Sequence, residues 1–254
     1  PFIAFAGFGV IVLIALRWRL PDDEPQFPAR GKTFNEPLSA SSQMGNPETE
    51  LDLPNEERSD HQGKRLSWSE PRVRPWVIAG LVGGHAQAML LGIVGFLILD
   101  RLGLRSDAIN GAGPIGLVLM AGALATLVAQ WGVIPRFNLG PKAATIGGIA
   151  LASIGVIIFA VSFTLNSIAL GYAIASLGFG LFRPGTTSGT SLAVSRAEQG
   201  EASGIVASVA GAAFIFAPAL GVFLYNFSEP IAFSLIIGLC AAVFFIGLKQ
   251  LTSD

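Results

Sequence analysis

Long stretches without a charged residue constrain this chain more than any other feature of its sequence. A helix needs about 20 mostly apolar residues to cross roughly 30 Å of hydrocarbon at about 1.5 Å per residue. Asp, Glu, Lys and Arg are absent from five blocks of about this length or more: 75–99, 108–135, 143–182, 202–228 and 230–248. Block 143–182 is long enough for two helices. The sequence therefore predicts an all-α polytopic membrane protein.

The composition agrees with a membrane environment and argues against several other classes of protein. Hydrophobic residues make up 52% of the chain and charged residues 13%, against about 25% charged residues in soluble domains. A net charge of −1 gives no electrostatic basis for binding nucleic acid. Cys240 is the only cysteine, which excludes an intrachain disulfide. Because no metal-binding, nucleotide-binding or hydrolase motif occurs either, we expect no enzyme, no metal and no cofactor.

Seven membrane-spanning segments are expected, the first of them truncated. The chain starts inside an apolar run, so we interpret residues 1–17 as the end of a helix that begins outside the sequence, and the protein as a fragment. Residues 18–75, rich in proline and charge, are expected to form a flexible cytoplasmic linker. Residues 76–250 then form a six-helix transmembrane domain. The predicted spans are 1–16, 76–99, 112–134, 143–163, 167–192, 203–225 and 230–248, with a turn at 164–167.

The distribution of basic residues predicts which ends of the spans face the cytoplasm. With the linker in the cytoplasm, 13 Lys and Arg residues lie on that side and 2 lie in the outer loops, as the positive-inside rule requires. Trp18, Trp76 and Trp131 fall at cytoplasmic ends, where tryptophan anchors helices at the membrane surface. Asp100 and Glu229 are expected to be solvated caps at the outer ends. We expect a bacterial inner-membrane protein whose linker and C-terminus are cytoplasmic.

Three motifs in the C-terminal third are similar to those of one transporter family. They are Gly178-x-Gly180 followed by Pro184, a charged turn at 198–201 that runs into Gly200-x-x-x-Gly204, and Ala217-Pro218-x-x-Gly221-x-x-x-Tyr225. The pattern resembles helices ten and eleven of the major facilitator superfamily, particularly its drug:proton antiporters. The resemblance implies the C-terminal six-helix half of that fold plus the end of the preceding helix. It also implies a twelve-helix secondary transporter whose halves rock around a central site.

The loop after the third span differs from the family pattern. In the family this loop can repeat the sequence G-x-x-x-D-R-x-G-R, but Pro135 occupies the acidic position here. We therefore expect no charge relay at this loop. The basic residues of the cytoplasmic loops, expected to act as gate or topology charges, are Arg136, Lys142 and Arg196. The resemblance places the acidic residues of proton coupling in the missing N-terminal half.

Arg183 is the only charged residue well inside a predicted span. Charges within spans are rare and costly, and they usually face a cavity or a partner. Thr186, Thr187 and Thr190 follow at helical spacing and share its face, and Pro184 is expected to kink the helix beside the charge. We interpret this face as part of a substrate pathway or gate. The alternative is an arginine that pairs structurally or extends to the membrane surface.

Three uncharged polar residues also interrupt the spans. His85 and Gln87 lie in the second span and Gln130 lies in the third. Histidine titrates near neutral pH, so His85 could link transport to protons. His85 and Gln87 are two residues apart on a helix and are predicted to point in different directions. For each of the three, a place in the substrate pathway competes with hydrogen bonding between helices.

Small residues and prolines predict where helices approach closely or bend. Gly80 and Gly84 belong to a stripe of small residues on the second span, and Gly204 belongs to one on the sixth. Pro218 and Gly221 are expected to give the sixth span a kink. Such faces serve static packing in any membrane protein, and in a transporter they are where helices move.

These features together predict a secondary active transporter that exports small amphipathic molecules by alternating access, driven by a proton gradient. One alternative is uptake or exchange of an organic anion that Arg183 contacts. Another is a non-transporting membrane scaffold or receptor. Transport predicts a cavity lined by the second and fifth spans, whereas a scaffold predicts close packing there. The expected partners are the lipid bilayer, a small-molecule substrate and the missing N-terminal half of the chain, with no nucleic acid.

Overall fold

The computed structural model describes residues 10, 14, 18, 66–195 and 198–251. The chain divides into two compact units, Pro1–Thr49 and Glu50–Asp254. In the first unit only Val10, Ile14 and Trp18 are described, each in a helical conformation. The predicted span 1–16 and most of the predicted linker therefore lie outside the described residues. The fold below is that of the second unit.

All regular elements that the structure describes between residues 66 and 251 are helices. Six of them, counting α4, η2 and α5 as one, are long and apolar enough to cross a membrane. This confirms the predicted all-α polytopic membrane fold and its six complete spans, with ends displaced by only a few residues. The helices are α3 (Arg74–Arg101), α4 (Ala108–Leu127), the π-helix η2 (Val128–Val133), α5 (Ile134–Phe137), α6 (Pro141–Ala160), α7 (Leu165–Leu192), α8 (Gln199–Phe227) and α9 (Glu229–Gln250).

Local capping explains where α7 begins. Thr164 Oγ1 accepts a hydrogen bond from the backbone N–H of Ser167 at 3.3 Å, and Ser167 Oγ accepts one from the backbone N–H of Thr164 at 3.2 Å. This reciprocal capping box satisfies backbone donors that a helix start leaves unpaired. The turn predicted at 164–167 therefore lies slightly earlier, and the helix starts directly after Thr164.

The helix that begins as α4 does not stay α-helical to its end. Residues Val128–Val133 form a π-helix, in which each backbone hydrogen bond spans five residues instead of four. The wider turn has the effect of one inserted residue, so α5 is rotated relative to an uninterrupted helix. Asn138 then ends α5 in the left-handed conformation with a φ of 46°.

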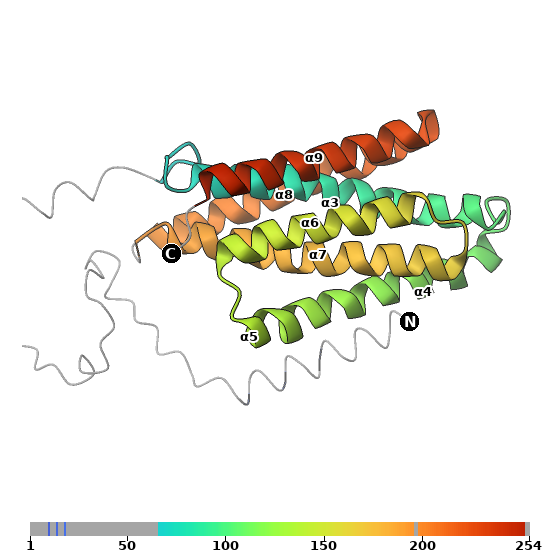
Figure 1. Cartoon of the computed structure of the whole chain (residues 1–254), viewed down its shortest axis with the longest axis horizontal. Coiled ribbons are helices and arrows are strands. Elements are labelled where there is room, and N and C mark those ends of the chain that lie inside the picture. Colours follow the sequence, from blue (N-terminus) through green and yellow to red (C-terminus); the bar gives the residue numbers. More distant parts are fainter. Residues whose placement is uncertain (1–9, 11–13, 15–17, 19–65, 196–197, 252–254) are drawn as a thin grey trace, which may run out of the picture. The chain divides into compact units, whose positions relative to one another are not determined.

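α6 and α7 lie side by side along most of their length (Figure 1). Glycines let their backbones touch. A Cβ added at Gly148 of α6 would lie 2.6 Å from the backbone nitrogen of Phe182, and one at Gly171 of α7 would lie 2.5 Å from that of Phe159. No larger residue fits at these points, which is how small residues bring membrane helices together.

α4 and α8 are the least covered of the membrane helices. In the most apolar stretch of 18 residues of each of these two spans, 17% of the residues are buried, against 50% in the corresponding stretches of α3 and α7. Large apolar side chains such as Leu124 on α4 and Phe216 and Phe223 on α8 are exposed. These faces are therefore left for lipid or for further protein to cover.

The predicted linker is corrected at its C-terminal end. Leu66 and Val73 are 8% and 0% exposed, and they pack with Val77 of α3 and Ala202 of α8. A segment that buries apolar side chains in this way is part of the fold, so residues 66–75 do not belong to a flexible linker. We call residues 66–73 the strap, and the end of the helices at which it lies the linker end.

Trp76 is not the membrane-surface anchor that the sequence predicts. Its side chain is 5% exposed and packs on α7, where a Cβ added at Gly189 would overlap the indole ring. Trp131, near the linker end of its helix, is 81% exposed, and its role as an anchor stays a prediction. A tryptophan at the right depth can therefore face either the lipid or a neighbouring helix.

Candidate functional site

A cavity of about 70 Å³ lies between α3, α7 and α8, in the half of these helices nearest the linker end. A cavity of this size has room for water molecules. Half of the lining consists of residues that the sequence predicts to lie in the substrate pathway or in close helix contacts: Gly80, Gly84, Gln87, Arg183, Thr186, Thr187 and Thr190. The remaining lining residues are Trp76, Val77, Phe182, Val206, Val209, Ala210 and Phe214.

Arg183 brings a positive charge to this cavity. Its Cζ lies 5.8 Å from the centroid of the Phe214 ring on α8, within the range of a cation–π contact. None of the four ion pairs among the described residues includes Arg183. An arginine keeps its charge at any physiological pH. The charge therefore remains available to an anionic group from a ligand or from another part of the protein.

The threonines beside Arg183 use their hydroxyl protons within α7. Thr186 Oγ1 donates to the carbonyl oxygen of Arg183 at 3.0 Å, and Thr190 Oγ1 donates to that of Thr186 at 2.9 Å. In this arrangement their oxygens can still accept hydrogen bonds from a ligand. Thr186 and Thr190 are buried, whereas Thr187 is exposed.

Gln87 lines the cavity from α3. Its side-chain Oε1 is buried and has no hydrogen-bond partner in the described chain. A buried acceptor without a partner costs about 1–3 kcal/mol. A donor group on a bound molecule or a water would recover part of that free energy.

His85 and Gln130 do not line this cavity. The Nδ1–H of His85 donates to the carbonyl oxygen of Leu81 on its own helix at 2.7 Å. Gln130 lies exposed in η2. The prediction that His85 and Gln87 point in different directions is confirmed, since Gln87 reaches the cavity and His85 does not. A pathway role for His85 and Gln130 stays a prediction that this cavity does not support.

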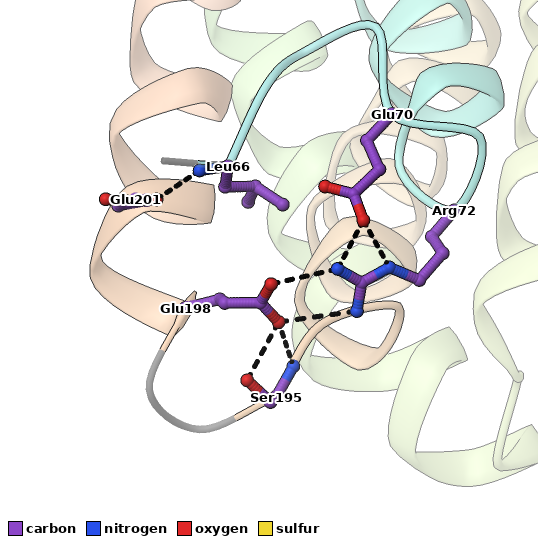
Figure 2. A network of polar contacts seen from close by, with 6 residues as sticks. All are labelled: Leu66, Glu70, Arg72, Ser195, Glu198 and Glu201. Atoms are coloured by element: carbon purple, nitrogen blue, oxygen red, sulfur yellow. Dashed lines mark hydrogen bonds and ion pairs between the residues drawn. The ribbon is translucent and has the colours of Figure 1, made fainter. Parts of the chain in front are cut away.

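A polar network joins the strap to the start of α8 (Figure 2). The Nη2 of Arg72 lies 2.5 Å from Glu70 Oε1 and 2.9 Å from Glu198 Oε1. Glu198 also accepts hydrogen bonds from the backbone N–H and the hydroxyl of Ser195, at 2.9 and 2.8 Å. Hydrogen bonds from Arg72, and then from Ser195, lower the pKa of Glu198 to about 2, and those to Glu198 and Glu70 raise the pKa of Arg72. The Arg72–Glu198 pair is therefore ionised at neutral pH.

Two further contacts fasten the strap. The backbone N–H of Leu66 donates to Glu201 Oε2 at 2.5 Å, as Figure 2 shows. Leu66 and Val73 also join Val77 and Ala202 in a small apolar cluster. Sequence reasoning missed this attachment. The two acidic residues after α7 are a visible signal, but nothing in the sequence pairs them with residues about half a chain away.

Ion pairs also hold the helices together at the opposite end. Asp100 of α3 accepts hydrogen bonds from Arg105 at 2.8 Å and from the Tyr225 hydroxyl of α8 at 3.0 Å. Arg101 pairs with Glu229 at the start of α9. The prediction that Asp100 and Glu229 are merely solvated caps is therefore wrong. Both carboxylates bridge between helices or loops.

Residues 1–196 match the family model described as Major Facilitator Superfamily. The chain belongs to the major facilitator superfamily. No curated protein matches it. This match ends before two of the three motifs that carry the resemblance seen in the sequence. The family-model match and the motif resemblance therefore come largely from different parts of the chain. The protein is therefore an integral membrane protein of a transporter family, in agreement with the six membrane-length helices among its described residues.

The small residues predicted to let helices approach closely differ in how near their neighbours lie in this superfamily member. A Cβ added at Gly84 would lie 3.1 Å from the Cβ of Ala213, a close contact of α3 with α8. Gly221, predicted only as part of a kink, is a further close contact, where an added Cβ would lie 2.7 Å from the carbonyl oxygen of Met89. At Gly80 the nearest atoms would be 3.9 Å away. The packing role of Gly204 stays a prediction. This glycine lies on the exposed face of α8, and a Cβ there would meet no described atom within 4 Å.

The remaining predicted residues lie at proline positions and in the loops. α7 and α8 continue past Pro184 and Pro218 without a break, and a kink at either proline stays a prediction. Arg136 is exposed in α5, and Lys142 is in the first turn of α6, both at the linker end. Arg196 lies outside the described residues. Gate or topology roles for these charges stay predictions.

Proposed function

We propose that this protein is a proton-driven exporter of small amphipathic molecules, and that the cavity between α3, α7 and α8 is its share of the substrate pathway. The lining supports this, because apolar and aromatic walls carry three threonines, one amide and one guanidinium. Small-molecule sites are mostly apolar with a few placed polar groups. The observation that carries the proposal is the convergence of Arg183, the threonines and Gln87 on one hollow.

The cavity is too small to hold a whole substrate. It measures about 70 Å³, against roughly 300–1,000 Å³ for sites that enclose a drug-sized ligand. The exposed apolar faces of α4 and α8 suggest what completes it. A second six-helix half would cover these faces and supply the other wall, as in transporters built from repeats. We propose that this half precedes the present helices in the same protein.

The proposed orientation places the linker end and the C-terminus in the cytoplasm of a bacterial inner membrane. Arg136, Lys142 and Lys249 lie at the linker end of the helices, whereas Arg101 and Arg105 lie at the opposite end. This asymmetry agrees with the positive-inside rule. No carboxylate lines the cavity among the described residues, so we expect the proton-carrying acids in the other half.

Uptake or exchange of an organic anion is the second candidate. It is favoured by Arg183, whose charge has no carboxylate partner among the described residues. An anion with an aromatic body could pair with the guanidinium and contact Phe214. A non-transporting scaffold has less support, because it predicts close packing where the cavity lies.

Transport by the full-length protein in proteoliposomes tests both candidates. A proton-driven exporter moves a lipophilic dye only when a pH gradient is imposed, whereas an anion exchanger moves an aryl carboxylate against a counter-anion without one. Arg183→Ala should slow transport about tenfold or more, because a charge-assisted contact contributes about 1.5–3 kcal/mol. Arg183→Lys should retain part of the rate. Ser188→Ala, on the same helix but outside the cavity lining, serves as the control. Wild-type rates in both Arg183 variants would contradict a pathway role.

A further inference from the structure

We propose that residues 66–76 form a gate at the linker end of the cavity, with Trp76 as the plug and the Arg72–Glu198 ion pair as the latch. The purpose of the gate rests on the proposed transport function. Its geometry rests on contacts of described residues alone. The gate predicts that breaking the latch exposes the cavity to water from the linker side.

The plug is the indole ring of Trp76. It lines the cavity and is only 5% exposed. The ring also lies against Gly189 of α7, where an added Cβ would overlap it. Thr190, the next residue of α7, lines the cavity and is 1% exposed. The ring therefore fills the space between α3 and α7 beside the most deeply buried threonine of the cavity.

The latch lies one helical turn before the plug in sequence. Arg72 is four residues before Trp76, and its guanidinium bonds to Glu198 at the start of α8. The pair thus ties the segment that carries the plug to a different helix. Its side chains are 46% and 28% exposed. Such a partly exposed pair contributes at most about 1 kcal/mol, so it can open and close readily.

The contact between α3 and α8 is much tighter away from the strap. A Cβ at Gly92 would lie 2.5 Å from the carbonyl oxygen of Pro218, and one at Gly221 would lie 2.7 Å from that of Met89. Beyond this crossing, the Tyr225 hydroxyl donates to Asp100. The two backbones are therefore in contact on one side of the cavity, while weaker contacts hold the strap on the other. Opening is expected at the linker end, with the Gly92–Pro218 crossing as the pivot.

Labelling of a buried cysteine tests the gate in the full-length protein. Thr190→Cys is introduced into a Cys240→Ser background, and its reaction with a membrane-impermeant maleimide is followed from the linker side in membrane vesicles. Glu198→Gln should raise the labelling rate by up to about fivefold, the factor that corresponds to about 1 kcal/mol. Trp76→Ala should raise it about tenfold or more, because a large buried side chain is lost.

Two further variants separate the gate from a general loosening of the fold. Exchanging the charges, Arg72→Glu with Glu198→Arg, should return labelling toward the parent rate. Glu229→Gln removes a carboxylate of similar exposure, 30% against 28%, from an ion pair at the opposite end. It should leave labelling at Thr190→Cys unchanged.

The outcomes distinguish the gate from the transport proposal. Unchanged labelling in both Glu198→Gln and Trp76→Ala would overturn the gate. Equal increases in Glu229→Gln and Glu198→Gln would also overturn it, since they would indicate a loosened bundle. If labelling rises as expected while Arg183 variants transport at the wild-type rate, the gate stands and the role of Arg183 fails.

Discussion

The α6–α7 pair and the α3–α8 pair show two ways of packing apolar helices. Along α6 and α7, backbone meets backbone at Gly148, Gly155, Gly171 and Gly178, because glycine leaves no side chain at these points. Between α3 and α8, glycines do this only at Gly92 and Gly221, and toward the linker end the helices diverge around a cavity. One pair is built as a fixed unit. The other is closed by contacts that are individually weak.

The difference teaches where polar groups can be placed in such a protein. α7 belongs to both regions: one of its faces is packed on α6, and the other carries Arg183 and Thr186 toward the cavity. A polar or charged side chain is positioned more precisely when its helix is held from behind. We therefore expect the α6–α7 pair to act as the scaffold, and α3 and α8 to move against it.

The largest expected effect comes from filling a contact in the fixed pair. Gly155→Leu would force a side chain into the backbone of Ala175, and overpacking of this kind costs about 3 kcal/mol. The variant should lose most of its folded protein, measured by size-exclusion chromatography in detergent and by thermal unfolding. Gly147→Leu, on the same helix but with open space around it, is the control. Equal behaviour of the two variants would contradict the packing described.

Two glycines of α8 should change the stability of the protein in opposite directions when each is replaced by alanine. Gly221→Ala places a methyl 2.7 Å from the carbonyl oxygen of Met89, and we expect a loss of about 1–3 kcal/mol of unfolding free energy. Gly204→Ala has open space within the described chain and should gain up to about 1 kcal/mol from helix propensity. Chemical denaturation of both variants measures the difference. Destabilisation by Gly204→Ala of the full-length protein would reveal a partner on that face.

Gln87 offers a test that separates stability from function. Gln87→Met removes a buried acceptor that lacks a partner in the described chain. It should raise the free energy of unfolding by about 1 kcal/mol while it slows transport. Thermal unfolding and transport rates are measured on the same preparation. Lower stability together with an unchanged transport rate would show that Gln87 is a structural residue.

The smallest expected effect is the pH dependence of the strap. The pKa of Glu198 is lowered in the folded protein from 4.5 to about 2. Its contribution to stability is therefore present above pH 4.5 and is lost as the pH falls from there toward 2. At pH 7 the free energy of unfolding of wild type should exceed that of Glu198→Gln by less than about 1 kcal/mol. This difference should shrink below pH 4.5. The difference in stability between wild type and Glu198→Gln is the quantity to measure, because it isolates the contribution of this one carboxylate. A difference that widens on acidification would contradict the assignment.

Sequence reasoning was most successful for the apolar spans themselves and for the polar or charged residues that interrupt them. It predicted the six complete spans and the face that carries Arg183, Thr186 and Thr190. It misjudged Trp76, Asp100 and Glu229, and it missed the glycine contacts of α6 with α7. In water, apolar residues mark the buried face of a helix, but lipid is as apolar as a protein core. The apolar pattern of a membrane helix therefore says little about which neighbour each face meets.

The π-helical turn at Val128–Val133 has a consequence for how the length of this chain can vary. Elsewhere in a spanning helix, deleting one residue would rotate everything beyond it by about 100°. Within this turn, the same deletion would convert hydrogen bonds that span five residues into the ordinary α-helical pattern. The segment is thus a natural site for a gain or loss of one amino acid. Relatives of different length are expected to differ here first, with Trp131 and Arg136 turned toward new neighbours.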